Sequence, residues 1–137
     1  MIGMSSFINA SSFSRANGVV NDSSTNLEWQ DDYTDNNNMI KETTWENAID
    51  YCETLTLDTK NDWRLPNLNE LTSLVDDTKH NPSLNSLFEN TNSNNYWSST
   101  SPSDTNEDAW IVNFYYGFQD GNDKSFNSYV RCVRAGQ

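Results

Sequence analysis

Residues 96–134 read YWSSTSPSDTNEDAWIVNFYYGFQDGNDKSFNSYVRCVR, in which regular strand-like anchors alternate with residues of no fixed period. The anchors are Tyr96, Trp97, Ala109, Trp110, Phe114, Gly117 and residues 129–134. Between them lie Ser, Asn, Asp, Tyr and Phe residues that no packing period explains. A fixed scaffold that presents a separately chosen surface produces such a pattern. The segment therefore favours a binding module over an enzyme.

Upstream of this segment, the sequence predicts a strand pair followed by a helix. Residues 18–20 and 27–29 flank the polar turn 22–26, which is a strand, turn, strand signal. After a polar loop over residues 31–38, Thr43 and Glu46 fit a capping box. The helix predicted there follows from apolar residues at helical spacing, namely Trp45, Ala48, Ile49, Cys52 and Leu55.

A second helix and a β region complete the pattern. Residues 62–65 predict a short buried strand that ends at Pro66, and Asn67 with Glu70 caps a helix that extends through Leu74 and Val75. Beyond Asn95 the pattern is that of a strand, with residues 110, 112 and 114 on one face and 111, 113 and 115 on the other. Because the helices are clustered rather than alternating with strands, we expect an α+β domain with two main helices, a small antiparallel sheet and a long loop-rich region.

Length and composition bound the class of protein. A chain of 137 residues predicts one domain, which we place at residues 15–137, with residues 1–14 as a disordered tail or the remnant of a signal peptide. Hydrophobic residues are only 34% of the chain, but five Trp, six Tyr and six Phe supply enough large side chains for a packed core. The small apolar start that ends at Ala10 indicates an exported protein, whether periplasmic, cell-surface or secreted.

The charge balance excludes some partners. Asp and Glu number 20 against 8 Lys and Arg, a net charge of −12, and no basic cluster offsets this excess. Such a chain repels phosphate backbones and anionic lipid surfaces, so nucleic acid is not an expected partner. No run approaches the roughly 20 apolar residues of a membrane span, so we expect no membrane insertion. Nothing in the sequence indicates a homo-oligomer.

The two cysteines, Cys52 and Cys132, are too far apart for a zinc knuckle or a Cys-x-x-Cys motif. A disulfide between the first helix and the last strand is the natural pairing. Two buried free thiols are the alternative, and they would suit a cytosolic protein. The arginines Arg64, Arg131 and Arg134 are expected to be structural, either stacked on aromatic rings or paired with Asp22 or Asp62.

Several motifs together resemble the Lcl C-terminal domain family over about residues 15–136. They are Asn17-Gly18-Val19-Val20, Asp22, Trp29, Trp45, Ala48, Cys52, Asp62-Trp63-Arg64-Leu65-Pro66-Asn67, Glu70-Leu71, Tyr96-Trp97-Ser98-Ser99-Thr100, Ala109-Trp110 and Val130-Arg131-Cys132-Val133-Arg134. The resemblance implies a fold similar to C-type lectins and formylglycine-generating enzymes, with a disulfide from helix to last strand. It also implies extracellular bacterial proteins, often adhesins. The trimeric, glycosaminoglycan-binding head of a collagen-like member is not implied here, since this chain has no collagen repeat, heptads or basic stripe.

The closing segment also resembles the variable region of lectin-like proteins diversified by retroelements. On that reading the ligand-binding positions are Ile111, Asn113, Tyr115, Tyr116, Phe118, Gln119, Asp120, Asn122, Asp123, Ser125, Phe126 and Asn127. Aromatic rings offer rigid contact area and Asn and Ser offer adaptable hydrogen bonds, as in antibody paratopes. The alternative is that Tyr116, Phe118 and Phe126 merely cover the core.

Metal binding and catalysis have weaker signals. Asp104, Asn106 and Asp108 follow an alternating oxygen-ligand spacing that permits calcium, although the Gly and Glu of an EF-hand loop are missing. His80 is the only histidine, and adjacent carboxylates such as Asp31 and Asp32 are expected to be solvated. We therefore expect no enzyme. The function predicted is a ligand-binding or adhesion module for a protein or glycan, and the alternative is a non-catalytic structural accessory domain of the cell envelope.

Overall fold

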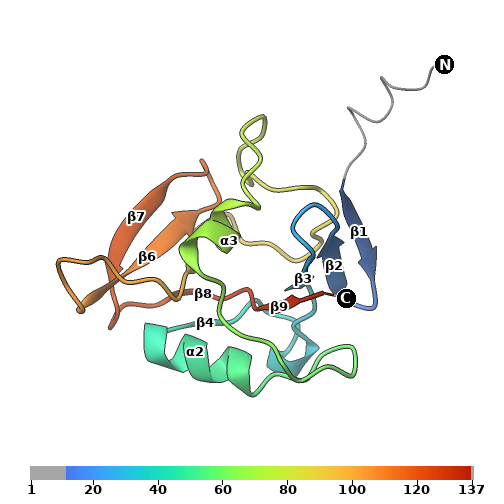
Figure 1. Ribbon diagram of the computed structural model, residues 1–137, viewed down its shortest axis with the longest axis horizontal. Coiled ribbons are helices and arrows are strands. Elements are labelled where there is room, and N and C mark those ends of the chain that lie inside the picture. The colour runs from blue at the N-terminus through green and yellow to red at the C-terminus, as the bar shows by residue number, and fades with distance from the viewer. Residues whose placement is uncertain (1–11, 137) are drawn as a thin grey trace.

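A four-stranded antiparallel sheet joins the two ends of the part of the chain that the computed structural model describes, residues 12–136 (Figure 1). Its strands are β1 (Phe13–Ala16), β2 (Val19–Asp22), β3 (Leu27–Gln30) and β9 (Val133–Ala135), in the order β1-β2-β3-β9. The predicted hairpin is confirmed as β2 and β3. Asn17 and Gly18 join β1 to β2 with φ of 56° and 76°, which suits the two-residue turn that favours Asn-Gly.

The first strand begins before the domain boundary expected at residue 15. Strand β1 begins at Phe13, so two residues assigned to the tail belong to this sheet. The rest of the expected signal remnant, residues 1–11, lies outside the described residues.

The second sheet has five strands in the order β4-β8-β5-β6-β7. They are β4 (Glu42–Thr43), β8 (Ser128–Tyr129), β5 (Asn95–Trp97), β6 (Asp108–Asn113) and β7 (Gln119–Asp123). Strands β5 and β8 pair in parallel and the other pairs are antiparallel. The order of strands, then helices, then strands is confirmed, whereas the expectation of a single antiparallel sheet is wrong. The hairpin of β6 and β7 lies at the opposite end of the molecule from β1 (Figure 1).

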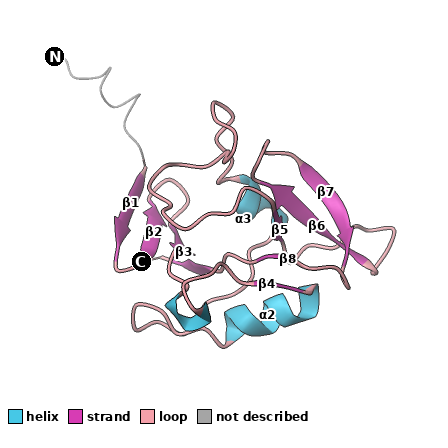
Figure 2. Cartoon of the chain, turned by 180° about the vertical axis from the view of Figure 1, so that it is seen from behind, coloured by secondary structure: helices cyan, strands magenta, loops and turns pink. Residues whose placement is uncertain are grey.

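Between β3 and β5 in sequence, residues 12–136 contain one 3-10 turn, η1 (Thr34–Asn36), and two short α-helices, α2 (Trp45–Glu53) and α3 (Leu68–Thr72). Helix α2 lies along the outside of the molecule beside β4 (Figure 2). The capping box of α3 is confirmed, because Asn67 Oδ1 accepts from the backbone N–H of Glu70 at 2.8 Å and Glu70 Oε1 accepts from that of Asn67 at 2.9 Å. The box expected for α2 is wrong. Its N-cap is Thr44, with no side-chain hydrogen bond, because Thr43 is a strand residue paired with Ser128.

The core consists of two clusters, and strand β6 contributes to both. Ile111 packs with Trp97 and with Cys52 of α2, whereas its neighbour Val112 packs in the cluster that contains Leu71 of α3. A strand with apolar partners on both faces shows no clean alternation of exposed and buried residues. The predicted alternation of buried and exposed residues is therefore wrong at Ile111, which is 1% exposed. Trp110, which is expected in the core, is only partly buried.

Three local expectations have different outcomes. Cys52 and Cys132 form the expected disulfide, with a Cα–Cα distance of 5.5 Å, and no described cysteine is free. The strand predicted at residues 62–65 is reduced to a single bridge between Arg64 and Val133. Helix α3 ends at Thr72, so Leu74 and Val75 follow it in a turn.

Asp31 and Arg131, which are distant in sequence, form a buried ion pair, and their side chains are 0% and 2% exposed. Asp31 accepts from Arg131, from Arg15 at 2.9 Å and from the backbone N–H groups of Glu89 and Asn90. Burial opposes the charge of Arg131, but the side chains of Tyr33, Tyr96 and Asp31 outweigh it and raise its pKa. The expectation of a solvated Asp31 is wrong, because the carboxylate has four donors within the protein.

Arg64 and Arg134, for which structural roles are also predicted, both form ion pairs within the protein. Arg134 Nε donates to Asp62 Oδ1 at 2.6 Å and Nη1 donates to Glu28 Oε1 at 2.6 Å, so the expected pairing with Asp62 is confirmed. Arg64 instead binds Glu70 at the surface. Asp22 has no arginine partner, since its Oδ1 accepts from Ser12 and Ser24.

Candidate functional site

Exposed aromatic side chains gather at the turn between β6 and β7, and we call Tyr115, Tyr116 and Phe118 the aromatic tip. Tyr116 is 69% exposed and Phe118 is 47% exposed. Tyr115 is half-buried, and its ring lies 4.5 Å from that of Tyr116 between centroids. Large apolar side chains left in solvent are the unusual feature of a protein surface, and they often mark a contact site.

The backbone that carries the tip is held firmly. Asn113 Oδ1 accepts from the N–H groups of Tyr115 and Tyr116, and Asn113 Nδ2 donates to Asn95 Oδ1 at 2.8 Å. Gly117 has a φ of 93°, and a Cβ there would lie 2.8 Å from a methyl group of Val75. Only glycine fits this position without strain. The turn is thus a fixed support that presents the aromatic side chains to solvent.

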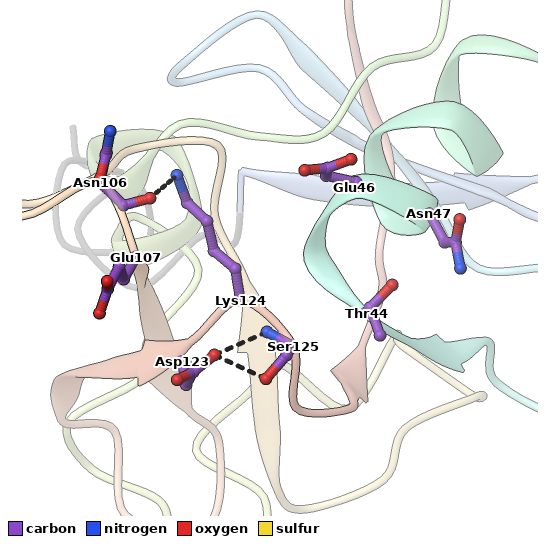
Figure 3. Close-up of a pocket in the computed structure, with 8 residues that line it drawn as sticks. All are labelled: Thr44, Glu46, Asn47, Asn106, Glu107, Asp123, Lys124 and Ser125. Atoms are coloured by element: carbon purple, nitrogen blue, oxygen red, sulfur yellow. Dashed lines mark hydrogen bonds between the residues drawn. The ribbon is translucent and has the colours of Figure 1, made fainter.

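A polar groove lies at the other end of the same hairpin, beside the start of α2, and we call it the α2 groove (Figure 3). Its volume is about 670 Å³. Three segments distant in sequence form its walls, and the residues that line it are Thr44, Glu46, Asn47, Asn106, Glu107, Asp123, Lys124 and Ser125. The backbone N–H of Trp45 donates to the carbonyl of Lys124 at 3.1 Å, which joins the helix to the end of the hairpin.

Lys124 is the one cation among the residues that line the α2 groove. Its Nζ donates to the carbonyl of Asn106 at 2.8 Å and lies 4.0 Å from the centroid of the Trp45 ring. The ammonium group is therefore engaged within the protein. Figure 3 shows Lys124 extended toward Asn106, with Glu46 and Asn47 on the facing turn of α2.

Carboxylates give the α2 groove its charge. The backbone N–H and the hydroxyl of Ser125 both donate to Asp123 Oδ1, and they lower the pKa of this carboxyl. Glu46 and Glu107 form no ion pair with any residue that the structure describes. The groove thus presents acceptors and hydroxyl groups and excludes anions, which suits a neutral polyhydroxylated or a cationic ligand group.

The predicted ligand-binding positions are divided between the aromatic tip, the α2 groove and the exposed surface beside them. Tyr115, Tyr116 and Phe118 form the tip, Asp123 and Ser125 line the groove, and the 58% exposed Phe126 follows directly after. Gln119, Asp120 and Asn127 are exposed, and Gln119 Nε2 donates to Thr72 on α3.

Three other predicted positions serve the frame instead. Ile111 is buried in the core and is not available to a ligand. Asn113 holds the turn, and Asn122 Nδ2 donates to Ser128 Oγ at 3.3 Å. Thr44, the N-cap of α2, and Glu46 and Asn47 of α2 line the groove but are not among the predicted site residues, because polarity at the start of a predicted helix was their only signal.

The predicted calcium site is supported only by the spacing of its residues in the sequence. No three His, Cys, Asp or Glu side chains gather into a metal-binding group within residues 12–136. The loop that contains Asp104, Asn106 and Asp108 is instead bound by a protein cation, since Lys124 takes the carbonyl of Asn106.

Residues 18–134 match the model of a protein family described as the Lcl C-terminal domain. No curated protein matches the chain. Within residues 12–136, no helix is long and apolar enough to cross a membrane.

Proposed function

The chain belongs to the Lcl C-terminal domain family, and from that premise we propose that it is an exported, non-catalytic module of C-type-lectin-like fold that binds a protein or glycan. The aromatic tip and the α2 groove are the contact surface. The observation that carries this proposal is the exposure of Tyr116 and Phe118 on a turn whose backbone is fixed by Asn113 and Gly117. Rigid aromatic residues lose little conformational entropy on binding, and they dominate many recognition surfaces.

The chemistry of the surface supports the ligand class. The tip offers apolar ring faces, which sugars and protein side chains both contact. The α2 groove adds amides, hydroxyls and carboxylates, which bind hydroxyl and amino groups. The net charge of −12 opposes nucleic acid and anionic lipid as partners. The disulfide between Cys52 and Cys132 supports export, because such bonds persist in oxidising compartments.

Replacement of both Tyr116 and Phe118 by Ser is expected to weaken ligand binding by roughly 30-fold or more, since loss of interface aromatics commonly costs about 2 kcal/mol or more. The measurement is a screen of the purified chain on glycan and protein arrays, followed by affinity measurement for each ligand found. Binding that is lost in this double variant supports the proposal.

Met39→Ser is the matched control. Met39 is 65% exposed, as the tip residues are, but it precedes β4 at the opposite edge of the second sheet. Its replacement is expected to leave the affinity unchanged. A chain that binds nothing on either array, or a ligand that binds the double variant as tightly as the unchanged chain, would favour a structural accessory domain instead.

A further inference from the structure

We propose that a separate groove, formed by the loop after α3, binds a small ligand that carries a carboxylate on an apolar group. We call it the loop groove. Its volume is about 520 Å³, within the range of small-molecule sites. Lys79, His80, Pro82, Leu84, Ser86 and Phe88 are the lining residues that define its chemistry. It shares no residue with the aromatic tip or the α2 groove, so ligand binding in the loop groove can be tested independently of them.

The charge of the loop groove is opposite to that of the chain. Lys79 and His80 line it and no carboxylate does, although the chain has a net charge of −12. The α2 groove, by contrast, includes three carboxylates. The side chains of Lys79 and His80 form no hydrogen bond and no ion pair with any residue from 12 to 136.

Asp76 and Asp77 precede Lys79, and neither forms an ion pair with it within residues 12–136, although hydrogen bonds from Thr78 and the charge of Lys79 both lower the pKa of Asp76. Asp76 Oδ1 accepts from the backbone N–H of Thr78 at 2.9 Å and from its hydroxyl at 2.6 Å. These bonds turn the carboxylate into the loop. The ammonium group of Lys79 makes no direct bond to Asp76, so its three donors are open to a ligand, for which a carboxylate is a suitable partner.

The floor of the loop groove is apolar. Pro82, Leu84 and Phe88 supply it, and the ring of Phe88 is held between other side chains. The guanidinium carbon of Arg131 lies 4.6 Å from its centroid and the ring of Phe13 lies 6.1 Å away, edge to face. A fixed ring next to two basic groups fits a ligand with an apolar body and an acidic end.

Backbone hydrogen bonds fix the shape of the groove. The N–H groups of Asn81 and Ser83 donate to the carbonyls of Tyr115 and Phe114, both at 2.7 Å, and that of Asp76 donates to the carbonyl of Ser83 at 2.9 Å. The loop is thus attached to the hairpin of β6 and β7. Because the site exists before the ligand arrives, little ordering is needed on binding.

The test is an NMR titration of the full chain, labelled with ¹⁵N, with N-acetylphenylalanine and its neutral analogue N-acetylphenylalaninamide. It is run at physiological ionic strength, where charges beyond about 8 Å are screened. We expect the acid to shift the amide signals of residues 78–88 and to bind roughly tenfold more tightly than the amide. A peptide that ends in the same residue distinguishes the source: tighter binding indicates a chain terminus, and weaker binding indicates a free small acid.

Lys79→Gln is expected to reduce the affinity for the acid to that for the amide and to leave the amide unaffected. Lys60→Gln is the control, because Lys60 lies outside the groove in the turn that follows Leu57. Equal binding of acid and amide by the unchanged chain, or a preference that survives Lys79→Gln, would overturn the proposal. So would a concentration-dependent dimer that Lys79→Gln dissociates, because a second copy would then be the occupant.

Discussion

Replacement of Arg131 by Met is expected to lower the free energy of unfolding by about 3 kcal/mol, the lower end for a broken buried ion pair, because Arg15 still pairs with the carboxylate of Asp31. Asp31 is 0% exposed and cannot reach water to compensate. Arg131 also donates to the carbonyls of Gln30 and Asn90, at 2.6 and 2.7 Å, and both would lose a donor. The side chain thus joins β3 and the loop before β5 to the segment between β8 and β9.

Urea unfolding of the two proteins measures this loss. Arg64→Met is the control, because Arg64 forms a bidentate pair with Glu70, 2.8 Å for each bond, that is closer than the 3.1 Å bond of Arg131 to Asp31 but lies at the surface, with 44% of the Arg64 side chain exposed. An exposed pair of this kind contributes about 0–1 kcal/mol. If both variants lost the same small amount, Arg131 would not be the support of the frame that its burial indicates.

Removal of the disulfide is expected to have an effect of similar size. Cys52 and Cys132 are separated by 80 residues, and closing a loop of this length stabilises the folded state by on the order of 4 kcal/mol in the chain-entropy model. The bond attaches α2 to the segment that leads into β9, so it joins helix and sheet across the first core cluster.

The measurement compares the urea midpoint of the Cys52→Ala, Cys132→Ala double variant with that of the oxidised chain. Reduction of the unchanged chain is the second arm, and it is expected to produce a midpoint close to that of the double variant. A difference below about 1 kcal/mol in both arms would show that packing around the two cysteines, rather than the cross-link, holds α2 in place.

Local signals predicted the parts of the fold that depend on neighbouring residues. The β2 and β3 hairpin follows from its polar turn, the α3 box follows from Asn67 and Glu70, and α2 follows from apolar spacing. The pairing of the cysteines could also be predicted, because the chain has only two. These features need no knowledge of what lies across the molecule.

The errors arise where distant segments meet. Asp31 is polar in a polar stretch, and its burial depends on Arg131, 100 residues away, and on donors from Arg15 and from the backbone at residues 89–90. Ile111 was assigned to the surface because alternation assumes one buried face, whereas α2 and α3 supply apolar partners to both faces of β6. The α2 groove was missed for the same reason, since its walls come from three separate segments.

Tyr116 and Phe118 serve contact with a ligand and not the packing of the frame, and urea unfolding of the Tyr116→Ser, Phe118→Ser double variant distinguishes these two roles. If the residues serve ligand contact, the free energy of unfolding changes by no more than about 0.5 kcal/mol for each substitution, as expected for surface positions. A loss of about 3 kcal/mol or more for each residue, typical of a truncated core aromatic, would contradict that role.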